Sequence, residues 1–404
     1  MDYKSLPSDC YAMNICHINV VYGTGSTGGL VRDLHEACVA IGESKVFAGR
    51  SPIQSKSVVR VGSLRDTIIN GVSCRVFDND GFSALSNTRK LINTLREEKF
   101  DIFHLHNLHG YYVNIELLFD FFKGIDTPVV WTLHDCWSYT GHCAYYDLVS
   151  CEKWKSECHT CPNKREYPSS LYLDKSNQNF LRKKRLYDDF DNLTIVTPSH
   201  WLSDEVSLSI LADKDCNVIT NGIHDDFFSR KSVKRQERSG KIRILGVAAV
   251  WSMRKGIEDF VRLADLAEGE LAITLVGVDE KLKKRLPSSI TCLPRTHSVN
   301  DLIDLYDEAD YFFNPTYEET FGLVNAEAQS RGIPVISYNT GGCPETLHPK
   351  ISYIVEKGGV NEAHKIMSAI NYCDQDIAEL KDFASKFKSS TMIESYLELY
   401  KSVR

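Results

Sequence analysis

Short apolar runs alternate with amphipathic stretches along most of this chain. The run at residues 14–22 (NICHINVVY) has the composition of a buried strand. Apolar residues at helical spacing then extend from Leu30 to Ile41, and Gly42 is a helix end signal. Between the two lies a glycine-rich segment, residues 23–29. The pattern predicts strand, glycine loop and helix, the unit that opens an open α/β sheet.

The same alternation predicts two series of strands and helices. Further strands of the first series are expected at residues 101–106, 129–134 and 193–198, with an amphipathic stretch at 114–122. After Asn221-Gly222, strands are expected at 241–248, 271–276, 311–314 and 334–337, and helices at 256–267, 300–307 and 323–330. We therefore predict an α/β protein with two doubly wound, Rossmann-like domains that face each other across a cleft.

The domain boundaries follow from this pattern. We expect an N-terminal domain at residues 13–218 and a C-terminal domain at 219–391, with residues 1–12 as an appendage. The amphipathic segment 392–404 ends the second domain or crosses back onto the first. A length of 404 residues agrees with two domains that each bury a core.

Composition narrows the class of protein. The chain has 43% hydrophobic and 25% charged residues and a formal net charge of -7, which excludes disordered, collagen-like and coiled-coil proteins. It has no run of 18 apolar residues, and its start lacks the basic and apolar regions of a secretory signal. These features predict a cytoplasmic location. The mild acidity argues against a nucleic-acid partner.

Cysteine is the residue type that composition leaves unexplained. There are thirteen, and five of them fall between residues 136 and 161. All five lie in a polar insertion, residues 136–187, and four of them (Cys143, Cys151, Cys158 and Cys161) suit a structural tetrahedral zinc site. Reduced buried thiols and a disulfide are the alternatives, and His142 and His159 are alternative ligands.

The stretch from Cys151 to Tyr187 is locally basic. It holds nine Lys or Arg against four Asp or Glu, and Phe180, Leu181, Leu186 and Tyr187 interleave with residues 182–185 (RKKR). A solvated helix face is one interpretation. The other is a patch that contacts anionic lipid and a lipid-linked acceptor, which would make the protein peripheral at the inner face of the plasma membrane.

The most informative segment runs from Tyr311 to Glu345. It predicts a strand, a loop with Glu319, a tight glycine at Gly322, a helix, a second strand and a Gly-Gly turn. Free N–H groups at the helix start suit a phosphate. Since Glu319 and Glu327 flank this site, they are better explained as acceptors for sugar hydroxyls than as phosphate ligands.

These residues resemble the signature of the retaining, nucleotide-sugar-dependent glycosyltransferases of family 4, which have the GT-B fold. The resemblance rests on residues 319–327 (ETFGLVNAE), residues 332–336 (GIPVI) and residues 341–345 (GGCPE). It implies that Glu319 contacts the donor sugar at the reacting centre and that Glu327 binds ribose hydroxyls. Thr320, Phe321, Gly322 and Leu323 would hold donor hydroxyls and phosphate.

Other positions support the resemblance. Lys255-Gly256 matches the family's Lys-Gly, so Lys255 is expected to bind the diphosphate. The family also has an arginine five or six residues earlier, where this chain has Val250 and Ala249. Arg254 is the residue expected to supply that charge instead. Gly28 and Gly29 correspond to the turn that approaches the donor phosphate. His134, predicted at a strand end, corresponds to a histidine that touches the donor sugar.

Three further histidines sit at a predicted strand end. His104, His106 and His109 could bind an acceptor, or a metal through the H-x-H pair, although satisfied core histidines are equally expected.

The function implied is transfer of a sugar, with retention and without a catalytic metal or other cofactor. The donor would be a UDP or GDP sugar, and the acceptor a saccharide, expected to be lipid-linked, in surface polysaccharide (O-antigen or exopolysaccharide) biosynthesis. The Trp-Thr-Leu-His-Asp run at 131–135 and the following Cys-rich stretch resemble a colanic-acid-type subset. The competing functions are a nucleotide-sugar epimerase or phosphorylase of the same fold, and a non-catalytic scaffold that binds sugar or nucleic acid.

Overall fold

The computed structural model describes residues 13–230, 240–369 and 372–404. The expected appendage, residues 1–12, lies outside the described residues. The chain divides into two compact units: unit 1 includes residues up to Ile219 and Ile393–Arg404, and unit 2 is Thr220–Met392.

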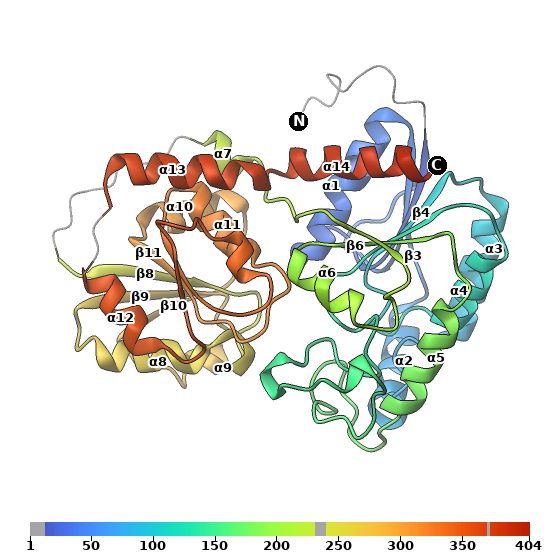
Figure 1. The fold of residues 1–404 in the computed structure, drawn as a ribbon, viewed down its shortest axis with the longest axis horizontal. Helices are drawn as coiled ribbons and strands as arrows, with labels where there is room; N and C mark the ends of the chain where they lie inside the picture. Colours follow the sequence, from blue (N-terminus) through green and yellow to red (C-terminus); the bar gives the residue numbers. More distant parts are fainter. Residues whose placement is uncertain (1–12, 231–239, 370–371) are drawn as a thin grey trace. The chain divides into compact units, whose positions relative to one another are not determined.

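Unit 1 is built on a parallel sheet of seven strands with helices on both faces (Figure 1). The strand order is β3-β2-β1-β4-β5-β6-β7. The strands are β1 Asn14–Val21, β2 Glu43–Arg50, β3 Val58–Arg60, β4 Ile102–Leu105, β5 Val129–Thr132, β6 Leu193–Thr197 and β7 Asp215–Val218. The helices are α1 Gly25–Ile41, α2 Leu64–Phe77, α3 Leu85–Glu97, α4 Ile115–Lys123, α5 Ser176–Tyr187 and α6 His200–Ser207. A last helix, α14 Ser389–Val403, begins in unit 2 and continues into unit 1.

Unit 2 has a parallel sheet of six strands in the order β10-β9-β8-β11-β12-β13. The strands are β8 Ile242–Val247, β9 Leu271–Val276, β10 Ile290–Leu293, β11 Tyr311–Asn314, β12 Val335–Tyr338 and β13 Tyr353–Val355. The helices are α7 Asp226–Ser229, α8 Ile257–Leu266, α9 Glu280–Lys283, α10 Val299–Glu308, α11 Leu323–Ser330, α12 Val360–Ala369 and α13 Asp374–Ala384. Both sheets are doubly wound, which confirms the predicted α/β class.

The strands form where the sequence is apolar because parallel sheets are covered on both faces. All four residues of β4, β5, β11 and β12 are buried. Strands with more polar residues, β7 and β10 among them, lie at sheet edges and were not predicted. Hydrophobic runs therefore identified most of the central strands, but missed the inner strand β2 and the edge strands.

The C-terminal helix α14 packs on the sheet of unit 1 through two buried tyrosines. The Tyr400 hydroxyl lies 2.6 Å from Nδ1 of His104, and the Tyr396 hydroxyl lies 2.9 Å from Oγ1 of Thr132. The last residues of the chain are thus part of unit 1, because their apolar stripe is buried against β4 and β5.

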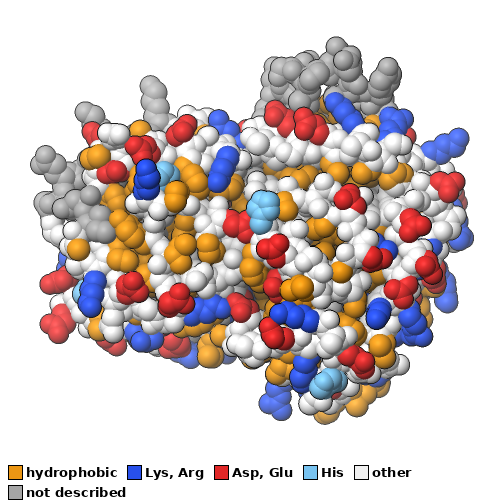
Figure 2. Space-filling view, viewed as in Figure 1, with side chains coloured by type: hydrophobic (Ala, Val, Ile, Leu, Met, Phe, Trp, Pro, Cys, Tyr) orange, Lys and Arg blue, Asp and Glu red, His pale blue; other side chains and the backbone are white. Residues whose placement is uncertain are grey.

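The surface carries mixed charge. On the face shown in Figure 2, Lys and Arg side chains are interspersed with Asp and Glu and do not gather into one basic surface of the kind that binds a phosphate backbone. Within the described ranges, no helix is both long and apolar enough to cross a bilayer.

Candidate active site

The candidate site in unit 2 lies where the strand order of its sheet reverses. β8 and β11 are neighbours, and the chain leaves them toward opposite edges of the sheet. In open α/β sheets, ligands bind beyond the carboxyl ends of the strands at this point. Lys255 follows β8 and Glu319 follows β11, so the fold brings together two residues that are 64 positions apart in the chain.

Lys255 and Glu319 form an ion pair through Nζ and Oε2. Their side chains are 20% and 17% exposed, so the pair is partly desolvated but still reachable by a ligand. Burial would raise the pKa of the Glu319 carboxyl, but the charges of Lys255 and Arg254 outweigh it and hold that pKa below its ordinary value. The carboxylate is therefore ionised at neutral pH, beside a cation that can bind phosphate.

The loop that carries Glu319 is held by hydrogen bonds to its own backbone carbonyls. The Arg254 guanidinium donates to the carbonyl of Glu318 at 3.0 Å, so this arginine positions the loop from the β8 side. Gly342 N–H donates to the carbonyl of Glu319 at 3.1 Å. A Cβ on Gly341 would lie 1.8 Å from that carbonyl oxygen, so only glycine allows the Gly-Gly turn to approach so closely.

Helix α11 begins directly after this loop. Gly322 is its N-cap, with φ of +95°, a conformation that favours glycine. Thr320 and Phe321 are buried, and Leu323 is the first helical residue. The N–H groups of the first turn have no partners within the helix, which makes the helix start suited to an anion. The predicted strand, loop and helix thus lie in the expected order around Glu319.

Glu327 lies one turn along α11, and its Oε2 accepts a hydrogen bond from the Tyr306 hydroxyl of α10 at 2.8 Å. Burial raises the pKa of the Glu327 carboxyl to about 7, and the hydrogen bond from Tyr306 lowers it only in part. The sequence did not indicate a role for Tyr306, because a tyrosine on the apolar face of a predicted helix is expected to be a core residue.

We expect Glu327→Gln to stabilise the protein at pH 8 and to have little effect below pH 4.5. The pKa of Glu327 is higher in the folded protein than its unfolded value of 4.5. The wild-type protein therefore loses folding stability as pH rises from 4.5 to about 7, and the loss persists above that. The shift corresponds to at most about 3 kcal/mol. Urea unfolding at both pH values measures it, and an equal effect at both would contradict the raised pKa.

A pocket of about 430 Å³ lies at the ends of β8, β9 and β10 in the same unit. Trp251 and the cations Lys281, Arg285 and Arg295 line part of it. The Arg295 guanidinium donates to the Ala249 carbonyl at 2.6 Å. The pocket therefore offers an aromatic ring and positive charge next to the strand that leads to Lys255.

In unit 1, the glycine segment differs from the prediction of a loop over residues 23–29. Helix α1 already begins at Gly25, so Gly28 and Gly29 are helical and the loop is shorter than predicted. Gly23 N–H donates to the carbonyl of Gly28 at 2.9 Å and closes the turn. A Cβ on Gly28 would lie 3.2 Å from Val21, whereas one on Gly29 would meet open space. Close packing thus explains Gly28, whereas nothing in the local packing requires a glycine at position 29.

His134 follows β5 by two residues and is largely buried. Its Nε2 lies 3.2 Å from Nδ1 of His106, which follows β4. Burial lowers the pKa of His134 to about 4, so its ring is neutral at pH 7. A neutral imidazole at a strand end can donate to or accept from a sugar hydroxyl.

His109 has a different setting from its neighbours in the chain. Its Nε2 and Nδ1 lie 2.8 Å from Oδ2 of Asp135 and from the hydroxyl of Tyr167. Burial lowers the pKa of His109, but the Asp135 carboxylate outweighs it, so the pKa is raised. His109 could have been an acceptor ligand, a metal ligand or a buried histidine with both nitrogens hydrogen-bonded, and its two partners fit the last of these.

The four cysteines Cys143, Cys151, Cys158 and Cys161 line one pocket, together with His142 and His159. The described cysteines are free thiols. Gly141 N–H donates to Sγ of Cys158 at 3.3 Å. Across the described ranges, no three of these cysteines have their sulfur atoms within 4.8 Å of one another. The sequence thus identified residues that share a pocket, with sulfurs wider apart than a bound ion would hold them.

In the basic stretch at residues 151–187, most of the apolar residues named for a lipid-facing patch lie in the core instead. The last third of this stretch forms α5, whose residues Phe180, Leu186 and Tyr187 are buried in the core. Lys183 is also buried and donates to the carbonyl of Thr140 at 2.9 Å. Of the four apolar residues named, only Leu181 is exposed. The alternation of apolar and basic residues reflects a helix docked by its apolar face.

Two family models match the chain. The model described as glycosyltransferase family 4 matches residues 29–227, and the one described as glycosyl transferases group 1 matches residues 241–372. Each match lies almost wholly within one of the two units, and together they cover most of the chain.

Proteins with similar sequences include glycosyltransferases of polysaccharide biosynthesis. A protein described as the colanic acid biosynthesis glycosyl transferase WcaC of Escherichia coli K12 is 23% identical over 97% of this chain and 100% of its own length. The capsular polysaccharide biosynthesis glycosyltransferase CapM of Staphylococcus aureus is 34% identical over 51% of this chain and 60% of its own.

Solved structures share the fold. Sucrose-phosphate synthase of Thermosynechococcus elongatus has a TM-score of 0.70 at 16% identity and covers 97% of this chain and 99% of its own. HepE of Anabaena, solved with UDP and glucose, has a TM-score of 0.64 at 15% identity and covers 96% and 100%.

Proposed function

The chain belongs to the family 4 glycosyltransferases, with the GT-B fold, and on this premise we propose that it transfers a sugar from a nucleotide-diphosphate donor to a saccharide acceptor in the assembly of a cell-surface polysaccharide. The observation that carries the proposal is the Lys255–Glu319 pair at the reversal point of the unit 2 sheet, beside the start of α11. The similarity to colanic acid and capsular enzymes supports the polysaccharide, and the fold shared with HepE supports a UDP-type donor.

In this proposal the donor binds along the strand ends of unit 2. The pocket with Trp251 and Arg295 takes the nucleoside, and Glu327 accepts hydrogen bonds from its ribose hydroxyls. The N–H groups that start α11 and the Lys255 ammonium bind the diphosphate. In unit 1, the residues that we propose for contact with a sugar and a phosphate are His134, Gly28 and Gly29.

The reaction proceeds with retention and without a catalytic metal. The bond from the anomeric carbon to the diphosphate oxygen breaks, and Lys255 and the loop amides stabilise the charge on the leaving group. The acceptor hydroxyl attacks the same face, and the departing phosphate takes its proton. Glu319 stabilises positive charge that develops on the sugar ring.

A donor screen tests the proposal. Thermal unfolding of the full chain with UDP-, GDP- and ADP-sugars at millimolar concentration should show a rise in Tm for at least one donor, since a ligand that binds only the folded state stabilises it. Turnover without acceptor would favour an epimerase, and a requirement for free phosphate would favour a phosphorylase. No shift with any donor would contradict the transferase.

We propose further that the cysteine pocket of unit 1 holds a structural zinc ion. Cys143, Cys151, Cys158 and Cys161 would be the ligands, since four thiolates form a closed tetrahedral site. The shared pocket and the N–H bond to Cys158 sulfur support this fit. Such an ion would order the insertion between β5 and α5 and take no part in the chemistry.

We expect Cys158→Ser to lose about one zinc equivalent and to lower the unfolding temperature. Cys373→Ser, at an exposed cysteine outside the pocket, is the control and should change neither. Elemental analysis of protein purified without added metal measures the zinc. Unchanged zinc in Cys158→Ser would contradict the site.

The membrane contact that we propose lies on α2 of unit 1. Ile68, Ile69 and Val72 are 57%, 65% and 55% exposed at helical spacing, which places them on one face. Arg65 and Arg75, exposed at the two ends of this stripe, give it the positive charge that anionic lipid attracts. A lipid-linked acceptor would be met at such a surface.

Replacing Ile68 and Ile69 together by serine should weaken binding to phosphatidylglycerol vesicles at least tenfold, because each exposed isoleucine that enters the interface contributes on the order of 1 kcal/mol or more. The double variant Val39→Ser, Leu208→Ser, also at exposed apolar positions of unit 1, is the matched control. Vesicle sedimentation measures the binding. Equal binding of both variants would show that α2 is not the contact.

A further inference from the structure

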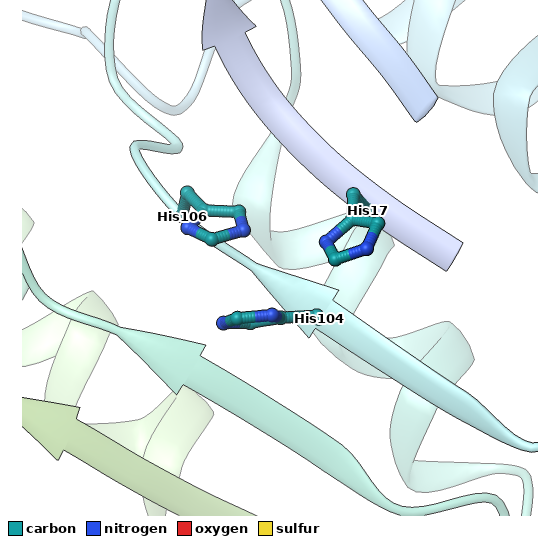
Figure 3. A group of neighbouring side chains, drawn as sticks. All are labelled: His17, His104 and His106. Carbon is teal, nitrogen blue, oxygen red and sulfur yellow. The ribbon is translucent and has the colours of Figure 1, made fainter. Parts of the chain in front are cut away.

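Three histidines lie together on one face of the unit 1 sheet (Figure 3). His17 of β1 is the register partner of His104 on β4, and His106 follows two residues later. Side chains two apart in an extended chain point to the same side. The sheet therefore brings one ring nitrogen of each histidine within 4.8 Å of the others. Across the ranges 13–230, 240–369 and 372–404, this is the one group of three or more His, Cys, Asp or Glu residues placed so closely.

These rings carry nitrogens that lack partners. His17 and His104 are fully buried, and His106 is 1% exposed. Among the described residues, neither ring nitrogen of His17 has a hydrogen-bond partner, nor does Nε2 of His106. Leaving a buried polar atom unpaired is destabilising, because the atom loses its bonds to water and gains none in return. Because His17 contributes two such atoms and His106 one, all within a buried group, an occupant that bonds to them is expected.

We propose that His17, His104 and His106 form a binding site for a transition-metal ion, with Zn²⁺ as the ion to test. Three imidazoles with no carboxylate suit Zn²⁺, Co²⁺, Ni²⁺ or Cu²⁺ and do not suit Mg²⁺ or Ca²⁺, which prefer oxygen. Nitrogens bound to tetrahedral Zn²⁺ at about 2.0–2.1 Å are about 3.4 Å apart. Binding therefore draws the three rings together slightly, and two of them have a lone pair to offer.

The remaining nitrogens already have the partners that orient metal-bound histidines. Nδ1 of His106 faces Nε2 of His134 at 3.2 Å, which leaves Nε2 of His106 for the metal. His104 lies between the Tyr400 hydroxyl at 2.6 Å and Oγ1 of Thr132 at 2.8 Å. His104 binds the metal by exchanging one of these two hydroxyls, and the other stays as its orienting partner.

The site has consequences for two neighbours. With Nε2 of His106 on the metal, its Nδ1 carries the proton and donates to His134, so the metal sets the tautomer of the proposed sugar contact. Through Tyr400, the same ion sits against α14, the helix that ends the chain. The metal site stands independently of the proposed transfer reaction, since it rests on buried side chains of unit 1 alone.

Metal content of matched variants tests the site. His17→Phe removes both unpartnered nitrogens and keeps a ring, and His106→Asn removes Nε2 while it keeps a polar atom near Nδ1. The control is His35→Asn, because the buried His35 bonds Ser44 through Nδ1 and lies outside the group. After chelator treatment and titration with Zn²⁺, the wild type and the control should bind one equivalent more than either test variant.

Two readouts separate this site from the cysteine pocket and from misfolding. With Co²⁺, the thiolate-to-metal absorption marks cysteine ligation, so His17→Phe should lose cobalt while that absorption stays unchanged. Added Zn²⁺ should raise the Tm of the wild type more than that of His17→Phe. The proposal would be overturned if the wild type, both test variants and the control bound the same amount of zinc and metal-free His17→Phe were more stable than the wild type. That result would show that the three histidines bind no metal ion.

Discussion

Lys255→Met should lower kcat for sugar transfer by about 10²–10³-fold. The loss is expected because the Lys255 ammonium is the side-chain cation that our proposal places on the leaving diphosphate, and removal of one such electrostatic group costs this much. Methionine keeps the length of the side chain and removes the charge. Steady-state transfer assays with saturating donor and acceptor measure the change.

The substitution should also move the acid side of the pH profile. Lys255 helps to hold the pKa of Glu319 below its ordinary value, so without it Glu319 takes up a proton at higher pH and activity is lost at higher pH. Lys365→Met, at an exposed position on α12, is the control and should leave kcat within twofold. If Lys255→Met kept a near-normal kcat and an unchanged pH profile of activity, the proposed role of Lys255 in the reaction would be wrong.

Glu319→Gln should reduce kcat by on the order of 10²-fold. Glutamine keeps an oxygen that accepts a hydrogen bond from a sugar hydroxyl, but it loses the negative charge that stabilises a positive sugar ring in the transition state. It also leaves Lys255 partly buried without its partner, which is costly for a desolvated charge. Donor affinity, measured by calorimetry, should change much less than kcat.

A double-mutant cycle tests whether the two residues act together. Because Lys255 and Glu319 are in contact, the double variant should lose less than the product of the two single effects. Glu362→Gln, an exposed glutamate in the first turn of α12, should have no effect on kcat. Fully multiplicative losses, or a near-normal Glu319→Gln, would contradict the pair as a catalytic unit.

The sequence alone was sufficient for the fold class and for the site motif. Central strands of parallel sheets are buried on both sides, so β4, β5, β11 and β12 appear as short apolar runs that local pattern detects. The segment with Glu319, Gly322 and Glu327 is local too, because a loop between a strand and a helix keeps its residues close in the chain. Edge strands, the inner strand β2 and the start of α1 were missed or misplaced, since mixed polar strands and glycines give no such signal.

Contacts between distant segments depended on the tertiary structure. The pairing of Lys255 with Glu319 comes from the adjacency of β8 and β11, and the raised pKa of Glu327 comes from burial beside Tyr306 of another helix. The docking of α5 buries Phe180, Leu186 and Tyr187, which the pattern of apolar and basic residues alone does not reveal. In the same way His17, an unremarked residue inside a strand, meets His104 and His106 only through sheet register. Periodicity along the chain determines which residues are buried, whereas strand order and register determine which of them meet.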